Sequence, residues 1–230
     1  LLAGDAVFAV PLWPSAADTA LHAEPTADGY LLRGELAQLP LAADADTFLL
    51  PVRCGAALGL FVVPRAATGM TMHALPLADG TRDGRLVLND VHCAANARLA
   101  STTPLEHAWE HAHALAGLAA SAYLLGLGEA LLEMTLEYLR VRKQFGRALG
   151  SFQALQHRLA DMYLHLRLSK AAIGAADGAP TADAAVRARH RASETTTRLV
   201  REAIQLHGAI GYTQQCDVSL FMQRALVMTA

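Results

Sequence analysis

The spacing of hydrophobic residues changes near residue 101 and divides the chain into two halves. In the first half, short runs of β-branched or aromatic residues alternate with turn-forming residues, which is the pattern of strands in an all-β domain. The runs that we predict to form strands are Val7–Val10, Tyr30–Leu32, Thr47–Val52, Leu58–Val63 and Leu86–Leu88. Their spacing predicts a small β-barrel or β-sandwich domain over residues 1–101.

In the second half, leucine and alanine recur at three- and four-residue steps, as on the apolar face of a helix. We predict a long helix that begins near Ser101 and is broken at Gly146–Gly150, a second from about Ser151, a third over Ala182–Leu206 and a short fourth over Val218–Arg224. Thr181 or Asp183 is expected to cap the third helix. Long helices joined by short loops predict an antiparallel four-helix bundle over residues 102–230, so the fold class is α+β.

Composition and charge exclude several classes of protein. With 53% hydrophobic and 17% charged residues, the chain has the composition of a folded protein. A formal net charge of −2 gives no reason to expect nucleic acid or an anionic membrane as partner. Charged residues or proline interrupt the apolar runs, so we expect no membrane span. The three cysteines lack the spacing of a disulfide framework or zinc site, which favours a reducing, cytoplasmic location and no metal.

The start of the sequence has no basic segment before an apolar one, so it does not read as a signal peptide. It opens at Leu1 rather than at methionine. We therefore expect a fragment, or a subunit whose earlier part is not included.

Basic residues gather in the segment from Tyr138 to Gly146, which reads Tyr-Leu-Arg-Val-Arg-Lys-Gln-Phe-Gly. Basic side chains at a helix C-terminus are favoured by the helix dipole alone, so a solvated turn is one explanation. The other is a ligand site. The forked guanidinium of Arg142 matches the oxygens of a diphosphate, and Phe145 just beyond it could cover a flat ring.

A second segment, from Gln205 to Thr213, reads Gln-Leu-His-Gly-Ala-Ile-Gly-Tyr-Thr. Glycines after a helix allow the backbone to approach a ligand closely. Glycine is also the usual residue that ends a helix, so this segment alone favours a structural role.

Taken together and in this order, the two segments resemble the C-terminal signature of the acyl-CoA dehydrogenase family. The intervening Phe-Gln-Ala-Leu-Gln-His, which begins at Phe152, belongs to the same signature. The first half resembles the family's middle β domain more loosely, at Ala27–Tyr30 and at the strand over Leu86–Ala95. The resemblance implies that the family's N-terminal helical domain is absent from this chain.

The family binds FAD between subunits, so the resemblance implies a cofactor and an oligomer, either a homo- or hetero-oligomer in the form of a dimer or tetramer. It implies that Arg142 and Phe145 meet the pyrophosphate and adenine side of a neighbour's flavin, with Gln153 as a further polar contact. It implies that Gln205, Gly208 and Ala209 line the dinucleotide; Ala209 replaces a glycine common in the family. It also implies an acyl-CoA substrate, from fatty acid or steroid side-chain β-oxidation, and electron-transfer flavoprotein as electron acceptor.

The resemblance weakens at the catalytic base, which is a glutamate in the family. One family position for it corresponds to Ala116, and the other falls just beyond Ala230. Ala114 and Gly117 occupy positions that usually meet the CoA. Nearby Glu110, His111 and His113 are candidates for an unusual base, although solvated helix residues are the more common case.

The segments expected at the flavin ring also differ from the family. Phe8–Trp13 stands where a Leu-Thr-Glu-Pro-like sequence is expected, and Leu36–Pro40 where an aromatic residue precedes Ile-Thr or Ile-Ser. Neither supplies the side-chain hydroxyl that meets the flavin ring in the family. Trp13 could stack on a ring, although a core or interface role is the more common case. Glu129, among the apolar positions of the long helix, is interpreted as an interface residue rather than a perturbed carboxylate.

Three functional hypotheses follow. The chain is an FAD-dependent acyl-CoA dehydrogenase whose base lies beyond Ala230. Alternatively, it is a catalytically degenerate subunit that completes the FAD site of an active homologue in a heteromer. The third hypothesis is a helical scaffold without a cofactor.

Overall fold

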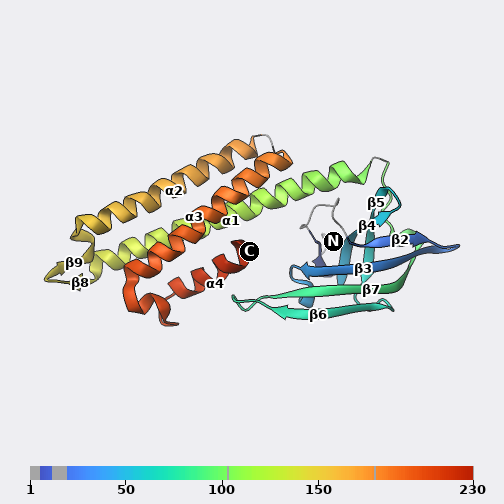
Figure 1. Ribbon diagram of the computed structural model, residues 1–230, viewed down its shortest axis with the longest axis horizontal. Coiled ribbons are helices and arrows are strands. Elements are labelled where there is room, and N and C mark those ends of the chain that lie inside the picture. The colour runs from blue at the N-terminus through green and yellow to red at the C-terminus, as the bar shows by residue number, and fades with distance from the viewer. Residues whose placement is uncertain (1–5, 12–19, 103, 179, 230) are drawn as a thin grey trace. The chain divides into compact units, whose positions relative to one another are not determined.

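The computed structural model describes residues 6–11, 20–102, 104–178 and 180–229 (Figure 1). The chain forms two compact units, Leu1–His113 and Ala114–Ala230. The first unit contains a β-sheet, and the second contains the greater part of a helical bundle.

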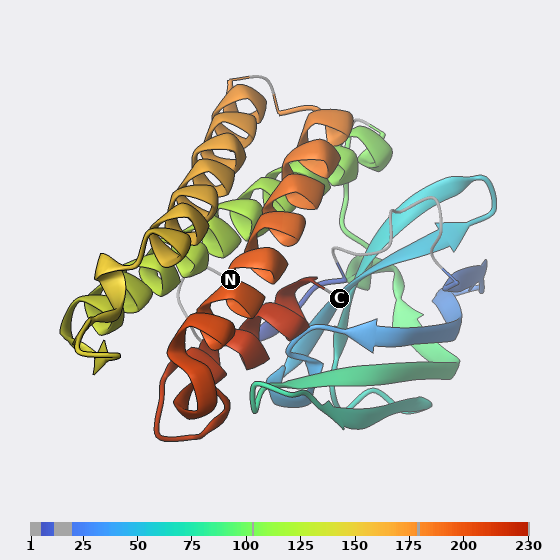
Figure 2. The ribbon, with the colours of Figure 1, turned by 60° about the vertical axis from the view of Figure 1, so that its left-hand side comes forward.

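The sheet of the first unit has seven strands and curls into a half-barrel (Figure 2). Its strands are β1 (Phe8–Ala9), β2 (His22–Pro25), β3 (Gly29–Leu39), β4 (Thr47–Cys54), β5 (Ala57–Pro64), β6 (Met70–Pro76) and β7 (Arg82–Ala94). They follow the order β1-β4-β2-β3-β7-β6, with β5 also paired to β4. The sheet is mixed, because β1 and β2 each pair with β4 in parallel while the other pairs are antiparallel.

All five predicted strand segments overlap strands, but β2 and β6 were not predicted. Neither strand is rich in β-branched or aromatic residues, and β6 is an edge strand with no fully buried residue. Pairing with longer neighbours, rather than local propensity, therefore accounts for both strands.

The inner face of the sheet forms a continuous apolar core. Phe48, Leu50 and Phe61 are fully buried there, together with residues of β3 and β7 such as Leu32 and Leu86. Successive side chains of a strand point to opposite faces of the sheet, and these residues point to the inner face. Burial of that face therefore fixes the register of the strands.

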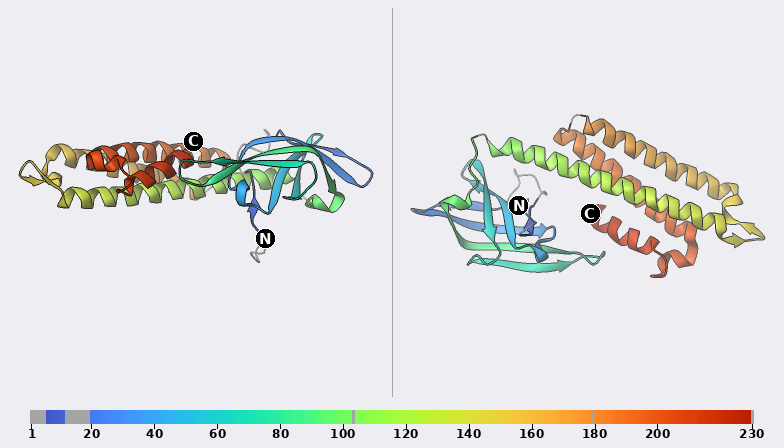
Figure 3. Two further views of the ribbon diagram at one scale, coloured as in Figure 1. Left: turned by 90° about the horizontal axis from the view of Figure 1, so that it is seen from below. Right: turned by 180° about the vertical axis from the view of Figure 1, so that it is seen from behind.

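The second half of the chain forms helices α1 (Leu105–Val141), α2 (Gln153–Asp177), α3 (Ala182–His207) and α4 (Val218–Thr229). Thr181 caps α3, because its Oγ1 accepts the Ala184 N–H at 3.2 Å, as predicted. The first helix ends at Val141, earlier than the predicted break at Gly146, since a hairpin of β8 (Lys143–Gln144) and β9 (Arg147–Ala148) follows it. Figure 3 shows α2 and α3 running along α1 in two further views.

The bundle core joins leucines of α1 to residues of α2, α3 and α4. Leu131, Leu139, Met162 and Leu199 are almost completely buried in it. Gly128 lets the helices approach closely, because a Cβ there would lie 2.9 Å from Leu166 Cδ2. The bundle is thus held by close packing of α1 against α2 and α3.

The expectation that charges or prolines interrupt every long apolar run is wrong for α1. Among the described residues this is one helix long and apolar enough to cross a membrane by length and composition. A single such helix is weak evidence for a span, because the core helix of a bundle has the same composition. Here the buried leucines of α1 pack against α2 and α3, which accounts for its apolar character.

Glu106, in the first turn of α1, accepts the Leu58 N–H at 2.8 Å within the first unit. This backbone hydrogen bond holds the pKa of Glu106 below its ordinary value. Because the folded pKa is the lower one, the stabilisation is present at neutral pH and is lost as the pH falls through the folded pKa. We expect Glu106→Gln to destabilise the protein near neutral pH and to have a smaller effect near pH 3. Urea unfolding at both pH values checks this, with the exposed Glu110→Gln as control.

Candidate functional site

The hairpin after α1 presents Phe145 at its tip. The Leu149 N–H donates to the Arg142 carbonyl at 2.8 Å and closes the base of the hairpin. Nearer the tip, Gln144 of β8 pairs with Arg147 of β9. The two turn residues, Phe145 and Gly146, both have positive φ, 54° and 80°. A two-residue hairpin turn with positive φ at both positions is of type I′, which favours asparagine and glycine rather than phenylalanine.

Phe145 therefore holds a strained backbone while its ring faces solvent. A left-handed conformation costs a bulky residue about 1–2 kcal/mol, yet the residue is 87% exposed and gains little burial in return. Its ring meets that of Phe152 edge-on, with centroids 6.1 Å apart, and the Arg147 guanidinium lies 4.0 Å above the Phe152 ring. An exposed aromatic ring kept at such a cost indicates a contact with another molecule.

We expect Phe145→Asn to raise the free energy of unfolding by about 1 kcal/mol, because asparagine tolerates this turn conformation better. Thermal unfolding measures the change. Gln144→Asn is the matched control, since Gln144 is in the adjoining strand, and it should give no gain. A destabilised Phe145→Asn protein would show that the ring serves the fold of the hairpin.

Cationic and hydrogen-bonding groups surround the base of this hairpin. Arg142 and Lys143 are exposed, and no ion pair involves either of them within the described part of the chain. The helix α2 begins at the exposed Gln153, and its N-cap residue Phe152 makes no side-chain capping hydrogen bond. A helix N-terminus without a side-chain cap, close in sequence to arginine and lysine, suits a phosphate group.

The second predicted segment forms the turn that ends α3. Gly208 has φ 67° and ψ −145°, a conformation that is largely restricted to glycine. Gly211 is required for packing, since a Cβ there would lie 3.0 Å from the Ile204 carbonyl oxygen. Gln205, Gly208 and Ala209 are all exposed. Ala209 is not among the residues with positive φ, so alanine meets no backbone strain in place of glycine.

Tyr138 and His207 join the two segments. Their rings stack at 4.4 Å with an interplanar angle of 23°, and the Tyr138 hydroxyl donates to the His207 carbonyl at 3.2 Å. His207 is itself fixed, because its Nδ1 lies 2.8 Å from the Ala203 carbonyl. Tyr138 is one helical turn before Arg142, and His207 directly precedes Gly208, so the stack fixes the ends of α1 and α3 beside each other.

Tyr138 and His207 lie within the two predicted segments, but no role was predicted for either of them. The available signal was their position, because Tyr138 lies one helical turn before Arg142 and His207 directly precedes Gly208. Nothing in the sequence shows that two residues 69 positions apart stack on each other.

The structure places no carboxylate at the expected base position on α1. Ala116 is partly buried, while Ala114 and Gly117 are buried. Of the candidates for an unusual base, Glu110 and His111 are exposed, and burial lowers the pKa of His113. The other family position falls beyond Ala230, outside the described residues.

The segment Leu36–Pro40 carries no side-chain hydroxyl. Leu36 and Leu39 are buried in the core of the sheet, and the Gln38 amide donates to Asp83 at 2.8 Å. Phe8 and Ala9 form β1, whereas Trp13 lies outside the described residues.

Glu129 does not lie within the apolar core of α1. Its side chain is 51% exposed and pairs with Lys170 of α2 at 3.5 Å. The ion pair accounts for a carboxylate next to apolar positions.

Comparisons with known proteins agree with this architecture. The sequence pattern of the family described as acyl-CoA dehydrogenase, C-terminal domain, matches residues 114–230. The acyl-CoA dehydrogenase IpdE2 of Mycobacterium tuberculosis is 43% identical over 110 residues, which cover 48% of this chain and 35% of that protein. The acyl-CoA dehydrogenase FadE27 of the same organism is 31% identical over 223 residues, covering 91% of this chain and 59% of that protein.

Among solved structures, the ChsE4-ChsE5 complex from Mycobacterium tuberculosis contains a chain similar to this one. The TM-score is 0.84 at 30% identity, with 99% of this chain and 62% of that chain covered. The chain therefore belongs to the acyl-CoA dehydrogenase family. It spans about a third to three fifths of the length of these curated relatives.

Proposed function

We propose that this chain is a subunit of an FAD-dependent acyl-CoA dehydrogenase and that it completes the FAD site of a partner subunit. The observation that carries the proposal is the joined pair of segments at the ends of α1 and α3. The stack of Tyr138 on His207 holds the ends of α1 and α3 together, and the ligand residues that follow these ends, Arg142, Phe145, Gly208 and Ala209, are all exposed. Because these residues are exposed, they could contact one side of a cofactor whose other side is bound by another subunit.

The residues present fit the adenosine diphosphate part of FAD. Arg142 has no ion pair among the described residues. The two parallel N–H donors of its guanidinium match a pair of diphosphate oxygens. Phe145 offers an open ring face for adenine or the adjoining ribose, and Gln153 and Gln205 add hydrogen-bonding groups. Gly208 and Ala209 permit close approach of the backbone. When bound, FAD supplies the acceptor for the hydride that leaves the β carbon of an acyl-CoA.

The chain's own contribution would be binding rather than proton transfer. Removal of the α proton of the thioester requires a base, and Ala116, Ala114 and Gly117 provide none. Leu36–Pro40 likewise has no side-chain hydroxyl for the flavin ring, and its two leucines belong to the core. A partner that carries the base and the ring contacts would complete the enzyme.

The partner we propose is a second member of the same family. The similar solved chain is from a complex named for two components, ChsE4 and ChsE5, which supports a hetero-oligomer. Acyl-CoA is then the substrate and electron-transfer flavoprotein the electron acceptor, both in the cytoplasm. A homo-oligomer with a base located beyond Ala230 is the competing arrangement.

Flavin content distinguishes these arrangements. The chain is purified alone and, separately, after co-expression with a partner of the family, and the absorbance near 450 nm is compared at equal protein concentration. We expect flavin only in the co-expressed complex. A chain that is yellow alone and bleaches with an acyl-CoA would replace our proposal by the homo-oligomeric enzyme. Absence of flavin in both preparations would contradict both arrangements.

A further inference from the structure

A groove lined almost entirely by apolar side chains lies between α1 and α4, within the second unit. Its volume is about 460 Å³, which is within the range of sites that bind small molecules. Helix α1 contributes Ala122, Tyr123, Gly126 and Leu127, and α4 contributes Leu220, Phe221 and Arg224. None of these residues belongs to the flavin segments at 138–146 and 205–213, so the groove is separate from the candidate site.

Gly126 opens the groove on the α1 side. Apart from the neighbouring backbone of its own helix, a Cβ at this position would meet no atom of the described chain within 4 Å, whereas a Cβ at Gly128 would lie 2.9 Å from Leu166 Cδ2. Close packing of the helices therefore requires Gly128 but not Gly126. Glycine is among the poorest residues for the interior of a helix, and Ala122, one turn earlier, is also small and exposed. These small side chains leave a hollow that the packing of the described chain does not explain.

Larger apolar side chains surround this hollow. Leu127 is buried in the core of the bundle and Phe221 packs against that core, so the positions of both are fixed. Tyr123 and Leu220 are 48% and 59% exposed. Large apolar residues that are exposed around a groove indicate contact with an apolar molecule.

Arg224 supplies the groove with a single positive charge. It is the only charged residue of α4, and α1 has no charged residue over 114–128. Its Nε donates to the Tyr123 hydroxyl at 3.0 Å, and the guanidinium carbon lies 5.1 Å from the centre of the Tyr123 ring. These two contacts orient the guanidinium at the groove. A guanidinium has five N–H donors in a planar fork that fits a carboxylate, so the bond to Tyr123 takes only part of its donor capacity.

We propose that this groove binds an apolar molecule that carries one carboxylate. The apolar part would lie over Ala122 and Gly126, and the carboxylate would accept hydrogen bonds from Arg224. A ligand without an acceptor would cover the guanidinium and remove water from it without replacing the lost hydrogen bonds, which is unfavourable. One cation among apolar residues is therefore complementary to one anion on an apolar body. The inference uses no flavin residue, so it does not depend on the proposed function.

Calorimetric titration of the full chain tests the preference for an acid. Decanoate is compared with decyltrimethylammonium, which has the same apolar chain and the opposite head charge. Pyrenebutanoate, followed by its fluorescence, represents a rigid polycyclic acid, so the two acids distinguish a flexible ligand from a rigid one. We expect at least one acid to bind about tenfold more tightly than the cation, and Arg224→Gln to weaken that acid by about tenfold or more.

Filling the hollow gives a second test that leaves the charge in place. Gly126→Leu should abolish binding of the acid, because the leucine side chain would occupy the groove. Gly174→Leu is the matched control: Gly174 is also a helix glycine whose Cβ would have open space, on α2. It should bind the acid as the unaltered chain does. Circular dichroism and thermal unfolding check that both variants are folded, as expected from the higher helix propensity of leucine.

The proposal is overturned if neither acid binds, if the acid and the cation bind equally well, or if Gly126→Leu binds the acid normally. A groove that binds no acid but is protected from hydrogen exchange after co-expression with a partner would be a protein contact instead. None of these results would alter the flavin comparison, so the two proposals can fail separately.

Discussion

Replacing Arg142 with alanine is expected to weaken FAD binding by the assembled complex by about ten- to a hundredfold. Charge-assisted hydrogen bonds contribute about 1.5–3 kcal/mol each, and alanine removes both the charge and the fork of donors. The folding of the chain should change little, because Arg142 is exposed and its side chain has no ion pair among the described residues. Equilibrium dialysis or quenching of flavin fluorescence gives the dissociation constant.

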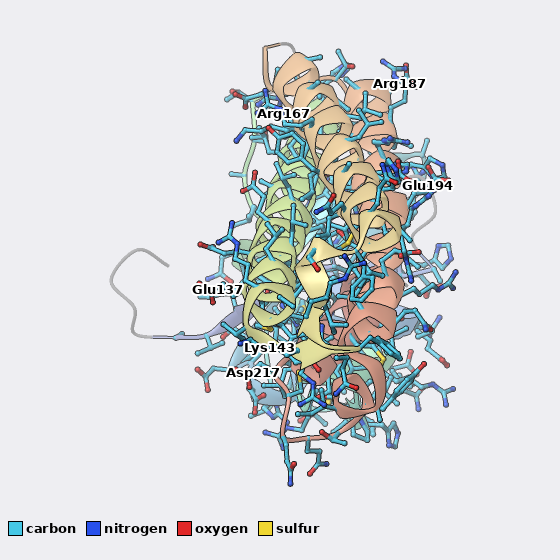
Figure 4. All side chains as sticks on the ribbon, turned by 90° about the vertical axis from the view of Figure 1, so that its left-hand side faces the viewer. Glu137, Lys143, Arg167, Arg187, Glu194 and Asp217 are labelled. Atoms are coloured by element: carbon cyan, nitrogen blue, oxygen red, sulfur yellow. The ribbon has the colours of Figure 1, made fainter. Side chains whose placement is uncertain are left out.

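Arg187→Ala is the matched control for this experiment. Arg187 is also an exposed arginine, but it lies on α3, where it pairs with Asp183, far from Lys143 and the hairpin (Figure 4). It should leave FAD affinity unchanged. Equal flavin retention in the Arg142→Ala and Arg187→Ala complexes would remove Arg142 from the site.

The second large effect is expected at Tyr138. Tyr138→Ala should lower the free energy of unfolding by about 3 kcal/mol, because it removes a packed aromatic ring and leaves a cavity beside His207. It should also weaken FAD binding, since the ends of α1 and α3 would no longer be held together. Urea unfolding and flavin titration on the same protein measure the two effects.

Tyr138→Phe separates the stack from the hydrogen bond. Phenylalanine keeps the ring and loses only the hydroxyl that donates to the His207 carbonyl, so we expect a loss of about 1 kcal/mol. Its FAD affinity should stay near that of the unaltered complex. If Tyr138→Ala destabilised the bundle without changing FAD affinity, the stack would have a structural role alone.

The sequence predicted most elements because their burial patterns are regular. The helices α2 and α3 begin within about two residues of their predicted starts. The glycine-containing break at Gly146–Gly150 precedes α2, and the capping residue Thr181 precedes α3. The strands β2 and β6 were missed because they depend on pairing with β3, β4 and β7. The hairpin after Val141 was missed because Phe145 occupies a turn position that normally requires asparagine or glycine.

Prediction of the candidate site depended on the two segments at 138–146 and 205–213 and on Gln153 in the segment between them, and it predicted no contact among these segments. The motif order identified Arg142 and Gly208, but the stack of Tyr138 on His207 is visible only in three dimensions. Burial of Leu36 and Leu39 in the core of the sheet gives those two side chains a structural role, which their sequence alone did not show. Glu129 was harder to place: its ion-pair partner is on α2, 41 residues away, as the positions of Glu129 and Lys170 show.

A structure of the purified complex with FAD and an acyl-CoA tests the central claim most directly. We predict that the diphosphate of each flavin lies against Arg142 and the turn at Gly208 of this chain. The flavin ring and the base beside the acyl chain would then belong to the partner subunit. A flavin held away from Arg142, or one whose ring lies in the β domain of this same chain beside its own base, would contradict the account.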